Sequence, residues 1–309
     1  MAATNRVALL AKLETTYGTD AVPVGATDAV LLQQAEITPM DVERIERPII
    51  RPFFGARPYA LAGKRVGISC SVDLAGAGAA GTVPAFGPLL RGCGMAQVVN
   101  AGVSVTYSPV SAGFESLSMY WNADGTQHKA LGARGTWSLE LAANSFPRLA
   151  LEYTGFFVAP TAVALPAVTL TAWQNPRPVG FVDTPVATID GFAVTMERFS
   201  YSHANAVTWR DLVGKREVAI TGRTPTCQVS IEAPALAAKN FFTLADTQAP
   251  VVVAVQQGTS SGGIVEFSLP QAQILNPRYR DSDGTLMLEL DLVPLPTTAG
   301  NNECLLTIR

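Results

Sequence analysis

The chain has 309 residues, of which 48% are hydrophobic and 15% are charged, and its formal net charge is −3 at pH 7. Soluble domains usually carry about 25% charged residues, so the surface is poor in charge, and the acidic balance argues against a nucleic-acid-binding protein, which would be basic. The chain holds no run of about 18 uninterrupted apolar residues, so no membrane-spanning helix is expected.

Apolar and polar residues alternate along several segments with the period of two that is typical of half-buried β-strands. In chain order, these segments are residues 66–74, 137–141, 149–153, 227–231 and 286–292. The pairs Asp124-Gly125 and Asp283-Gly284 lie beside such segments and predict turns. The sequence therefore predicts a protein built mainly of strands, each with one face on a core.

Only two segments have the pattern of an α-helix. They are residues 84–95 and 234–246, and each begins with a proline. Proline suits the first turn of a helix because the missing N–H costs little there. A chain of many strands with two short helices excludes a doubly wound α/β fold.

The two halves of the chain show the same order of predicted elements. Each half has an extended segment, a loop (51–63 or 202–214), an alternating strand and then a helix. We interpret this order as a diverged tandem duplication. The fold class expected is mainly β, with two tandem β-sandwich or β-barrel-like domains that each carry a short flanking α-helix. The predicted division is a first domain at residues 1–160, a Pro-rich linker at 161–187 and a second domain at 188–309.

The cysteines and the catalytic-looking motifs do not indicate a chemical site. Four widely spaced cysteines without a C-x-x-C pair favour buried, reduced thiols over a zinc site, and folding in a cytoplasm. The G-x-G-x-x-G match at 76–81 lacks the acidic residue that a dinucleotide site needs about 20 positions later. The G-x-S-x-G match at 258–262 has no later histidine to complete a triad. We expect no catalytic residue, no cofactor and no metal.

The loops 51–63 and 202–214 are unusually rich in aromatic, apolar and arginine residues, the types enriched at protein–protein interfaces. The predicted contact residues are Arg51, Phe53, Phe54, Arg57, Tyr59 and Leu61 in the first loop and Trp209, Arg210 and Leu212 in the second. One alternative is that these side chains fold back onto their own domain. Because two corresponding loops share this character, the sequence favours interfaces between subunits.

Several short motifs, spread over most of the chain, resemble those of the tail tube proteins of long-tailed bacteriophages. They are Glu14-Thr-Thr-Tyr-Gly-Thr, Glu46-Arg-Pro, Arg51-Pro-Phe-Phe-Gly, Leu74-Ala-Gly-Ala-Gly-Ala-Ala-Gly-Thr, Pro84-Ala-Phe-Gly-Pro-Leu-Leu-Arg-Gly-Cys-Gly, Val105-Thr-Tyr-Ser-Pro-Val, Arg210-Asp-Leu-Val-Gly and Ile231-Glu-Ala-Pro-Ala-Leu-Ala. None is a catalytic signature, so the resemblance depends on their number and order.

The resemblance implies a major tail tube subunit whose rings stack into a hollow tube for DNA ejection. It implies a β-sandwich with a flanking helix and long loops that reach neighbouring subunits. For a member of this family with two tandem domains, the resemblance implies a trimeric ring with pseudo-sixfold symmetry. The implied partners are the chain itself, a tape-measure protein, and tail terminator and baseplate proteins. Double-stranded DNA would pass the lumen without specific binding, and the protein would be made in the bacterial host cytoplasm and reside in the virion tail.

The acidic charge balance of the chain fits this role, and three alternatives stay open. An acidic wall repels phosphate, whereas clustered lysine and arginine would bind it, and head-to-tail stacking gives an open filament. One alternative is another ring component, such as a terminator, a baseplate protein or a secretion-system tube. A second is a β-sandwich module that binds a carbohydrate or a receptor. A third is an enzyme that uses the loop at 76–81.

Overall fold

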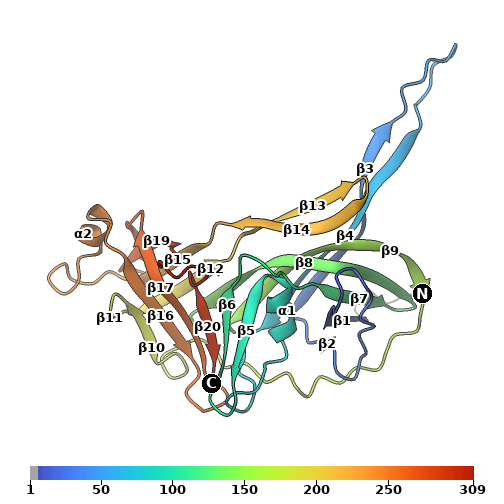
Figure 1. The fold of residues 1–309 in the computed structure, drawn as a ribbon. Coiled ribbons are helices and arrows are strands. Elements are labelled where there is room, and N and C mark those ends of the chain that lie inside the picture. Colours follow the sequence, from blue (N-terminus) through green and yellow to red (C-terminus); the bar gives the residue numbers. More distant parts are fainter. Residues whose placement is uncertain (1–5) are drawn as a thin grey trace.

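The computed structural model describes residues 6–309 and shows an almost entirely β protein (Figure 1). The first-half strands are β1 (Val7–Leu13), β2 (Ala29–Val30), β3 (Gln34–Glu46), β4 (Tyr59–Asp73), β5 (Met95–Asn100), β6 (Ser104–Pro109), β7 (Leu117–Ala123), β8 (Thr126–Ala142) and β9 (Arg148–Ala162). The second-half strands are β10 (Val186–Ile189), β11 (Phe192–Ala193), β12 (Met196–Ser202), β13 (Asn205–Leu212), β14 (Lys215–Arg223), β15 (Thr226–Glu232), β16 (Val251–Gln257), β17 (Val265–Ile274), β18 (Arg278–Ser282), β19 (Thr285–Pro294) and β20 (Leu305–Ile308). The helices are α1 (Gly87–Gly92) and α2 (Phe241–Asp246). The predicted mainly β fold class is confirmed, while residues 1–5 of the predicted first domain lie outside the described residues.

The alternating segments of the sequence form strands because one face of each is buried. They fall in β4, β8, β9, β15 and β19. In β4, for example, Val66, Ile68 and Cys70 are buried, while the residues between them reach the other face of the sheet. The predicted turn at Asp283 and Gly284 joins β18 to β19, and both residues have positive φ, at +52° and +79°. Positive φ at both central positions is the requirement of a type I′ hairpin turn.

Both predicted helices form, but each is shorter than the sequence pattern indicated. The helix expected from Pro84 begins at Gly87, because the N–H of Gly87 donates to the Pro84 carbonyl in a preceding turn. The helix expected from Pro234 begins after Asn240, whose side chain accepts a hydrogen bond from the Thr243 N–H at 3.0 Å. An asparagine cap therefore sets the start of α2.

One continuous antiparallel sheet, here called the main sheet, runs through both halves of the chain. Its strand order is β3-β4-β9-β8-β12-β15-β19-β18. The halves meet where β8 pairs with β12, with Leu139 opposite Tyr201 and Leu141 opposite Phe199. We call this pairing the internal seam. It places β3 at one edge of the main sheet and β18 at the other.

A second layer of strands covers the inner face of the main sheet. In this layer β7 pairs with β1, and a separate run joins β6 to β20, β20 to β17 and β17 to β16. Large buried rings between the layers come from both halves, and the ring centroids of Trp137 and Tyr201 are 5.1 Å apart. Tyr201 also packs on Phe267 of β17 at 4.8 Å. The shared core therefore holds the internal seam together.

Two β-hairpins leave the main sheet and are named here as arms. The long arm (residues 40–65) consists of the outer parts of β3 and β4 and their connection, and it projects from one corner of the molecule (Figure 1). The short arm (residues 204–224) contains β13 and β14, follows directly on β12 and leads into β15. Each arm therefore connects the first two main-sheet strands of its half.

The residues between β9 and β10 cross the surface without a strand of their own. Residues 163–185 follow the lower side of the molecule in Figure 1. Val179 is buried, and the Trp173 indole N–H donates to the Ala29 carbonyl at 2.9 Å. These contacts fix the segment against the body, so it is not a free tether.

The two glycine-rich motifs of the sequence meet where the halves touch. The Gly78 N–H donates to the Gly262 carbonyl at 2.9 Å. A Cβ at Gly76 would lie 2.1 Å from the same carbonyl oxygen. Since no side chain fits such an approach, the motifs serve the close packing of two backbones.

Candidate functional site

The long arm presents a set of exposed apolar and arginine side chains. Six of the predicted contact residues lie on it, namely Arg51, Phe53, Phe54, Arg57, Tyr59 and Leu61. Phe53 is 65% exposed, and Phe54 is fully exposed. Arg57 forms an ion pair with Glu46 at 3.2 Å, and the Arg51 guanidinium lies 5.9 Å from the centre of the Phe53 ring. An apolar arm that contacts so little of its own chain is typical of an interaction surface.

The short arm places its predicted contact residues differently. Trp209 is half-buried and packs edge to face on Phe156 of β9, with ring centroids 5.7 Å apart. Arg210 is exposed and lies 3.8 Å from Glu217 within the hairpin. Leu212 is exposed near the tip of the hairpin. Trp209 therefore contacts its own chain, whereas Arg210 and Leu212 stay accessible.

Polar contacts also hold the short arm on the first half of the chain. The Val218 N–H donates to the Tyr17 hydroxyl oxygen at 2.6 Å. Arg134 donates to the Val218 carbonyl at 2.9 Å, and its guanidinium lies over the Tyr17 ring. The Arg216 guanidinium lies 4.6 Å from the centre of the Phe156 ring. We call this docking surface, formed by Tyr17, Arg134 and Phe156, the first-half platform.

The outer face of the main sheet is polar and rich in hydroxyl groups. The strand register places Ser71, Ala150, Ser138, Ser202 and Thr226 side by side across five strands. The next row contains Arg148, Glu140, Ser200, Gln228 and Asp291. Both rows cross the internal seam, so the two halves form one polar face.

The arginines on this polar face are paired with carboxylates. Glu140 contacts both Arg148 at 2.9 Å and Arg198 at 2.6 Å. Near the β18 edge, Arg278 lies 3.2 Å from Asp291, and Arg280 lies 2.9 Å from Glu289. The acidic residues on the face include Glu36, Glu140, Glu152, Glu197, Glu289 and Asp291. The face therefore carries more acid than base.

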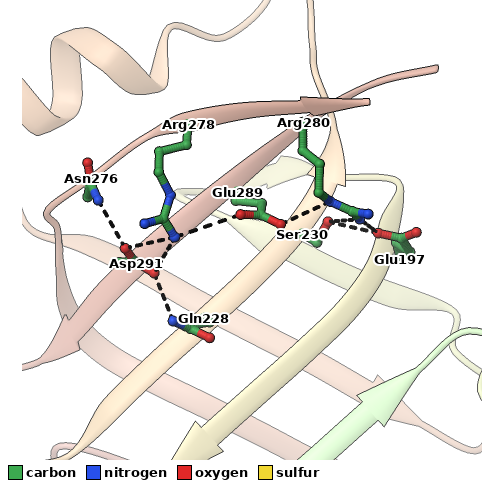
Figure 2. Close-up of polar contacts among 8 residues, drawn as sticks. All are labelled: Glu197, Gln228, Ser230, Asn276, Arg278, Arg280, Glu289 and Asp291. Carbon is green, nitrogen blue, oxygen red and sulfur yellow. Dashed lines mark hydrogen bonds and ion pairs between the residues drawn. The ribbon is translucent and has the colours of Figure 1, made fainter. Parts of the chain in front are cut away.

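Figure 2 shows the ion-pair network that holds β18 against the rest of the main sheet. Arg280 of β18 reaches Glu197 of β12, and the Ser230 hydroxyl of β15 donates to the same carboxylate at 2.9 Å. A β-bulge between residues 196 and 198 turns Glu197 to the polar face. The Ser230 hydrogen bond lowers the pKa of Glu197, with further help from Ser282 and Arg280. Glu197 is therefore held in its charged form.

Both edges of the main sheet offer unpaired backbone groups. Among residues 6–309, β3 pairs with β4 alone and β18 pairs with β19 alone. An open strand edge is a template for pairing with another chain. Neither these edges nor the polar face could be recognised in the sequence, because both depend on which strands become neighbours. The available signal was the alternation of polar with apolar residues, as at Ser69 between Ile68 and Cys70.

A buried polar cluster lies where the internal seam ends. His203 is buried, and its Nδ1 atom lies 2.8 Å from the Tyr201 hydroxyl, which lies 3.2 Å from the Cys304 sulfur. Burial, with a smaller contribution from the Arg223 charge, lowers the pKa of His203 to about 3. Arg223 is itself paired with Glu303 at 2.8 Å. His203 is therefore neutral and supports the structure of the seam.

The described residues show no arrangement suited to metal binding. No group of three or more histidine, cysteine or carboxylate side chains within residues 6–309 could hold a metal ion. All four cysteines are buried and unpaired, and burial raises the pKa of Cys70 and Cys304 to about 12. Neither helix in the described part of the chain is long and apolar enough to cross a membrane.

Comparison with known proteins gives one match over nearly the whole chain. A family model described as phage tail tube protein matches residues 4–298. No curated protein matches the chain at a significant level. The family match agrees with the resemblance carried by the sequence motifs.

Proposed function

The chain belongs to the phage tail tube protein family, and from this premise we propose that it is the major tail tube subunit. Copies of the chain form rings, the rings stack into a hollow tube, and double-stranded DNA leaves the capsid through the lumen. The protein acts structurally and not as an enzyme. It is made in the host cytoplasm and assembled into the virion tail. The observation that carries this proposal is the internal seam, together with the two free edges it leaves.

We infer that the internal seam is a template for the contact between copies. The halves of the main sheet run in the same order, β3-β4-β9-β8 and then β12-β15-β19-β18. In the internal seam, the last strand of the first half pairs with the first strand of the second half. By the same rule, β18 of one copy pairs with β3 of the next. This head-to-tail contact leaves no open edge if the ring closes.

The register of the proposed pairing follows from matching positions in the two halves. Ile37 of β3 and Tyr201 of β12 are equivalent positions, because each lies opposite the corresponding residue of the second main-sheet strand in its own half. Tyr279 of β18 and Leu139 of β8 are equivalent positions in the same way. Because Tyr201 lies opposite Leu139, Ile37 lies opposite Tyr279 of the next copy.

A ring of three such copies fits the proposed passage of DNA. Each copy supplies eight strands to the main sheet, so three copies supply 24 strands from six domains. With neighbouring strands about 4.8 Å apart, 24 strands close a barrel about 37 Å across, and strand tilt widens it further. A DNA double helix passes through an opening of this size. The duplication therefore supports a trimer with pseudo-sixfold symmetry.

The polar face of the main sheet becomes the lumen wall in this ring. Its serine and threonine hydroxyls present no fixed charge, and its arginines are paired with carboxylates. Free arginine and lysine would bind phosphates and release counterions. Since the acidic groups exceed the basic ones on this face, the wall repels DNA and allows it to slide.

The arms extend the contacts beyond one ring. The exposed tip of the long arm, with Phe53 and Phe54, suits stacking on the next ring. Arg210 and Leu212 at the short arm form a second proposed contact. A tape-measure protein inside the tube and terminator and baseplate proteins at its ends complete the proposed set of partners.

Reversal of one charge at the proposed contact between copies tests the ring. In the inferred register, Glu36 lies opposite Arg280 of the next copy, so the variant Glu36→Lys sets two positive charges face to face. The matched control is Glu152→Lys, which reverses an exposed carboxylate in a central strand of the same face.

Sedimentation velocity measures the assembly of each variant. We expect wild type and Glu152→Lys to form rings or tubes and Glu36→Lys to stay monomeric with unchanged circular dichroism. Normal assembly of Glu36→Lys would overturn the proposed edge pairing.

A further inference from the structure

We propose that the base of each copy's long arm, where Met40 and Ile45 lie, contacts the second half of its neighbour in the same ring, while the tip with Phe53 and Phe54 stays free to reach the next ring. The place of this base corresponds to the place of the short arm on the first half of its own chain. This inference rests on the proposed ring and deepens it, because it names a second contact surface away from the paired edges. The occupant of that surface is a second copy of this chain.

The short arm provides the template for this contact. It bends away after β12 and lies on the first-half platform, where Trp209 packs on Phe156 and Val218 is held by Tyr17 and Arg134. A two-stranded hairpin alone is marginally stable in water. The platform therefore stabilises the short arm. The long arm touches its own copy near its base, where Gly63 lies beside Trp209, but nearly all of residues 43–61 are exposed.

The long arm has an apolar residue at the same distance along the chain from the main sheet as Trp209. Trp209 lies eight residues after Tyr201 of β12, and Ile45 lies eight residues after Ile37 of β3. Tyr201 and Ile37 hold corresponding places in the two halves. Trp209 is half-buried on its platform, whereas Ile45 is 57% exposed.

The second half has an apolar surface at the position that matches the first-half platform. Phe156 lies three residues after Tyr153 in β9, and Leu295 lies three residues after Leu292 in β19. Tyr153 and Leu292 hold corresponding register positions beside β4 and β15. Leu295 is half-buried, and Leu275, which follows β17 directly, is 57% exposed. The Leu275 N–H donates to the Asp291 carbonyl and the Leu295 N–H donates to the Gln271 carbonyl, so the two leucines lie four residues apart along neighbouring strands. We call the surface that carries these two leucines the second-half platform.

Burial of both surfaces at once supports the second copy as occupant. Pairing β18 with β3 of the next copy brings the base of that copy's long arm toward the second-half platform, just as the internal seam brings the short arm to the first-half platform. Ile45 and Met40 on the arm and Leu275 and Leu295 on the platform are then removed from water together. The contact is continuous with the proposed edge pairing and needs no other partner.

Cross-linking between engineered cysteines tests the contact. The native cysteines are all buried, so a surface-directed reagent leaves them unmodified. The double variant Ile45→Cys with Leu295→Cys is assembled, treated with a short bismaleimide and separated on a denaturing gel. A second double variant, Met40→Cys with Leu275→Cys, uses two exposed positions and avoids any effect on folding. The control joins Ile45→Cys with Val103→Cys, an exposed site at the turn between β5 and β6.

The expected result is a ladder that ends at the trimer for both double variants and monomer for the control. A different result would overturn the arm contact and leave the tube function intact: both double variants form tubes but yield only monomer on the gel. A monofunctional maleimide must then label every engineered thiol, which shows that the thiols are accessible. Products larger than trimers would place the arm on a different ring and also overturn the inference. Failure of the wild-type protein to assemble would instead remove the ring on which the inference rests.

Discussion

Replacement of Trp209 by alanine separates a contact within the chain from a contact between subunits. The side chain packs on Phe156 with the ring centroids 5.7 Å apart. Complete removal of a buried tryptophan costs about 3–5 kcal/mol, and Trp209 is half-buried. We therefore expect Trp209→Ala to weaken docking of the short arm by about 2 kcal/mol. The control is Leu212→Ala on the same hairpin, where the side chain is already exposed.

Amide hydrogen exchange in the unassembled protein measures the weaker docking of the short arm residue by residue. A loss of about 2 kcal/mol corresponds to roughly 30-fold faster exchange, since each 1.4 kcal/mol is tenfold. We expect that acceleration in β13 and β14 for Trp209→Ala, and no change for Leu212→Ala. Unchanged exchange in Trp209→Ala, together with lost assembly, would refute the reasoning and make Trp209 a contact between subunits.

Three further predictions concern pH, thiols and DNA. His203 is neutral in the fold and titrates near pH 6.5 when the chain is unfolded, so below that pH the unfolded state binds more protons than the folded state. The free energy of unfolding therefore falls between pH 6.5 and 3, by up to about 1.4 kcal/mol per pH unit. Urea titrations at pH 7 and 5 should show a smaller fall for His203→Phe than for wild type. The four native thiols are buried, and burial raises their pKa. A thiol reagent should therefore label no cysteine in the native protein and all four in denaturant. Rapid labelling of the native protein would contradict the described core. The variant Glu140→Gln removes the carboxylate that pairs Arg148 and Arg198. Its tubes should bind a fluorescent DNA duplex at about 50 mM salt more tightly than wild type and release it at about 200 mM. Equal binding by the two proteins would argue against a wall kept inert by ion pairs.

The strands could be predicted because burial of one face leaves a local pattern. Cys227, Val229 and Ile231 are buried in β15, and the residues between them point to the polar face. The turn at Asp283 and Gly284 was predictable for the same reason, since the requirement for positive φ acts on those two residues alone. Helix starts were less predictable, because Asn240 and not Pro234 caps α2.

The candidate surfaces could be predicted only where composition marks them. Phe53 and Phe54 stand out in a loop, and both are exposed on the long arm. Trp209 has the same composition signal, but the first-half platform that covers it comes from residues far away in the sequence. The sheet edges and the polar face leave no local signal, because they depend on β8 pairing with β12 across 56 to 64 residues. Long-range pairing is fixed by the shared core and not by any short motif.

Negative-stain electron microscopy of the purified protein across a concentration series tests the central claim most directly. We predict hollow tubes or stacked rings of constant diameter, whose end-on averages show threefold symmetry with six similar lobes. Mass measurement of single rings should give three copies of the chain. Discrete particles at every concentration would contradict the tube and favour a binding module, and rings of six copies would contradict the trimer.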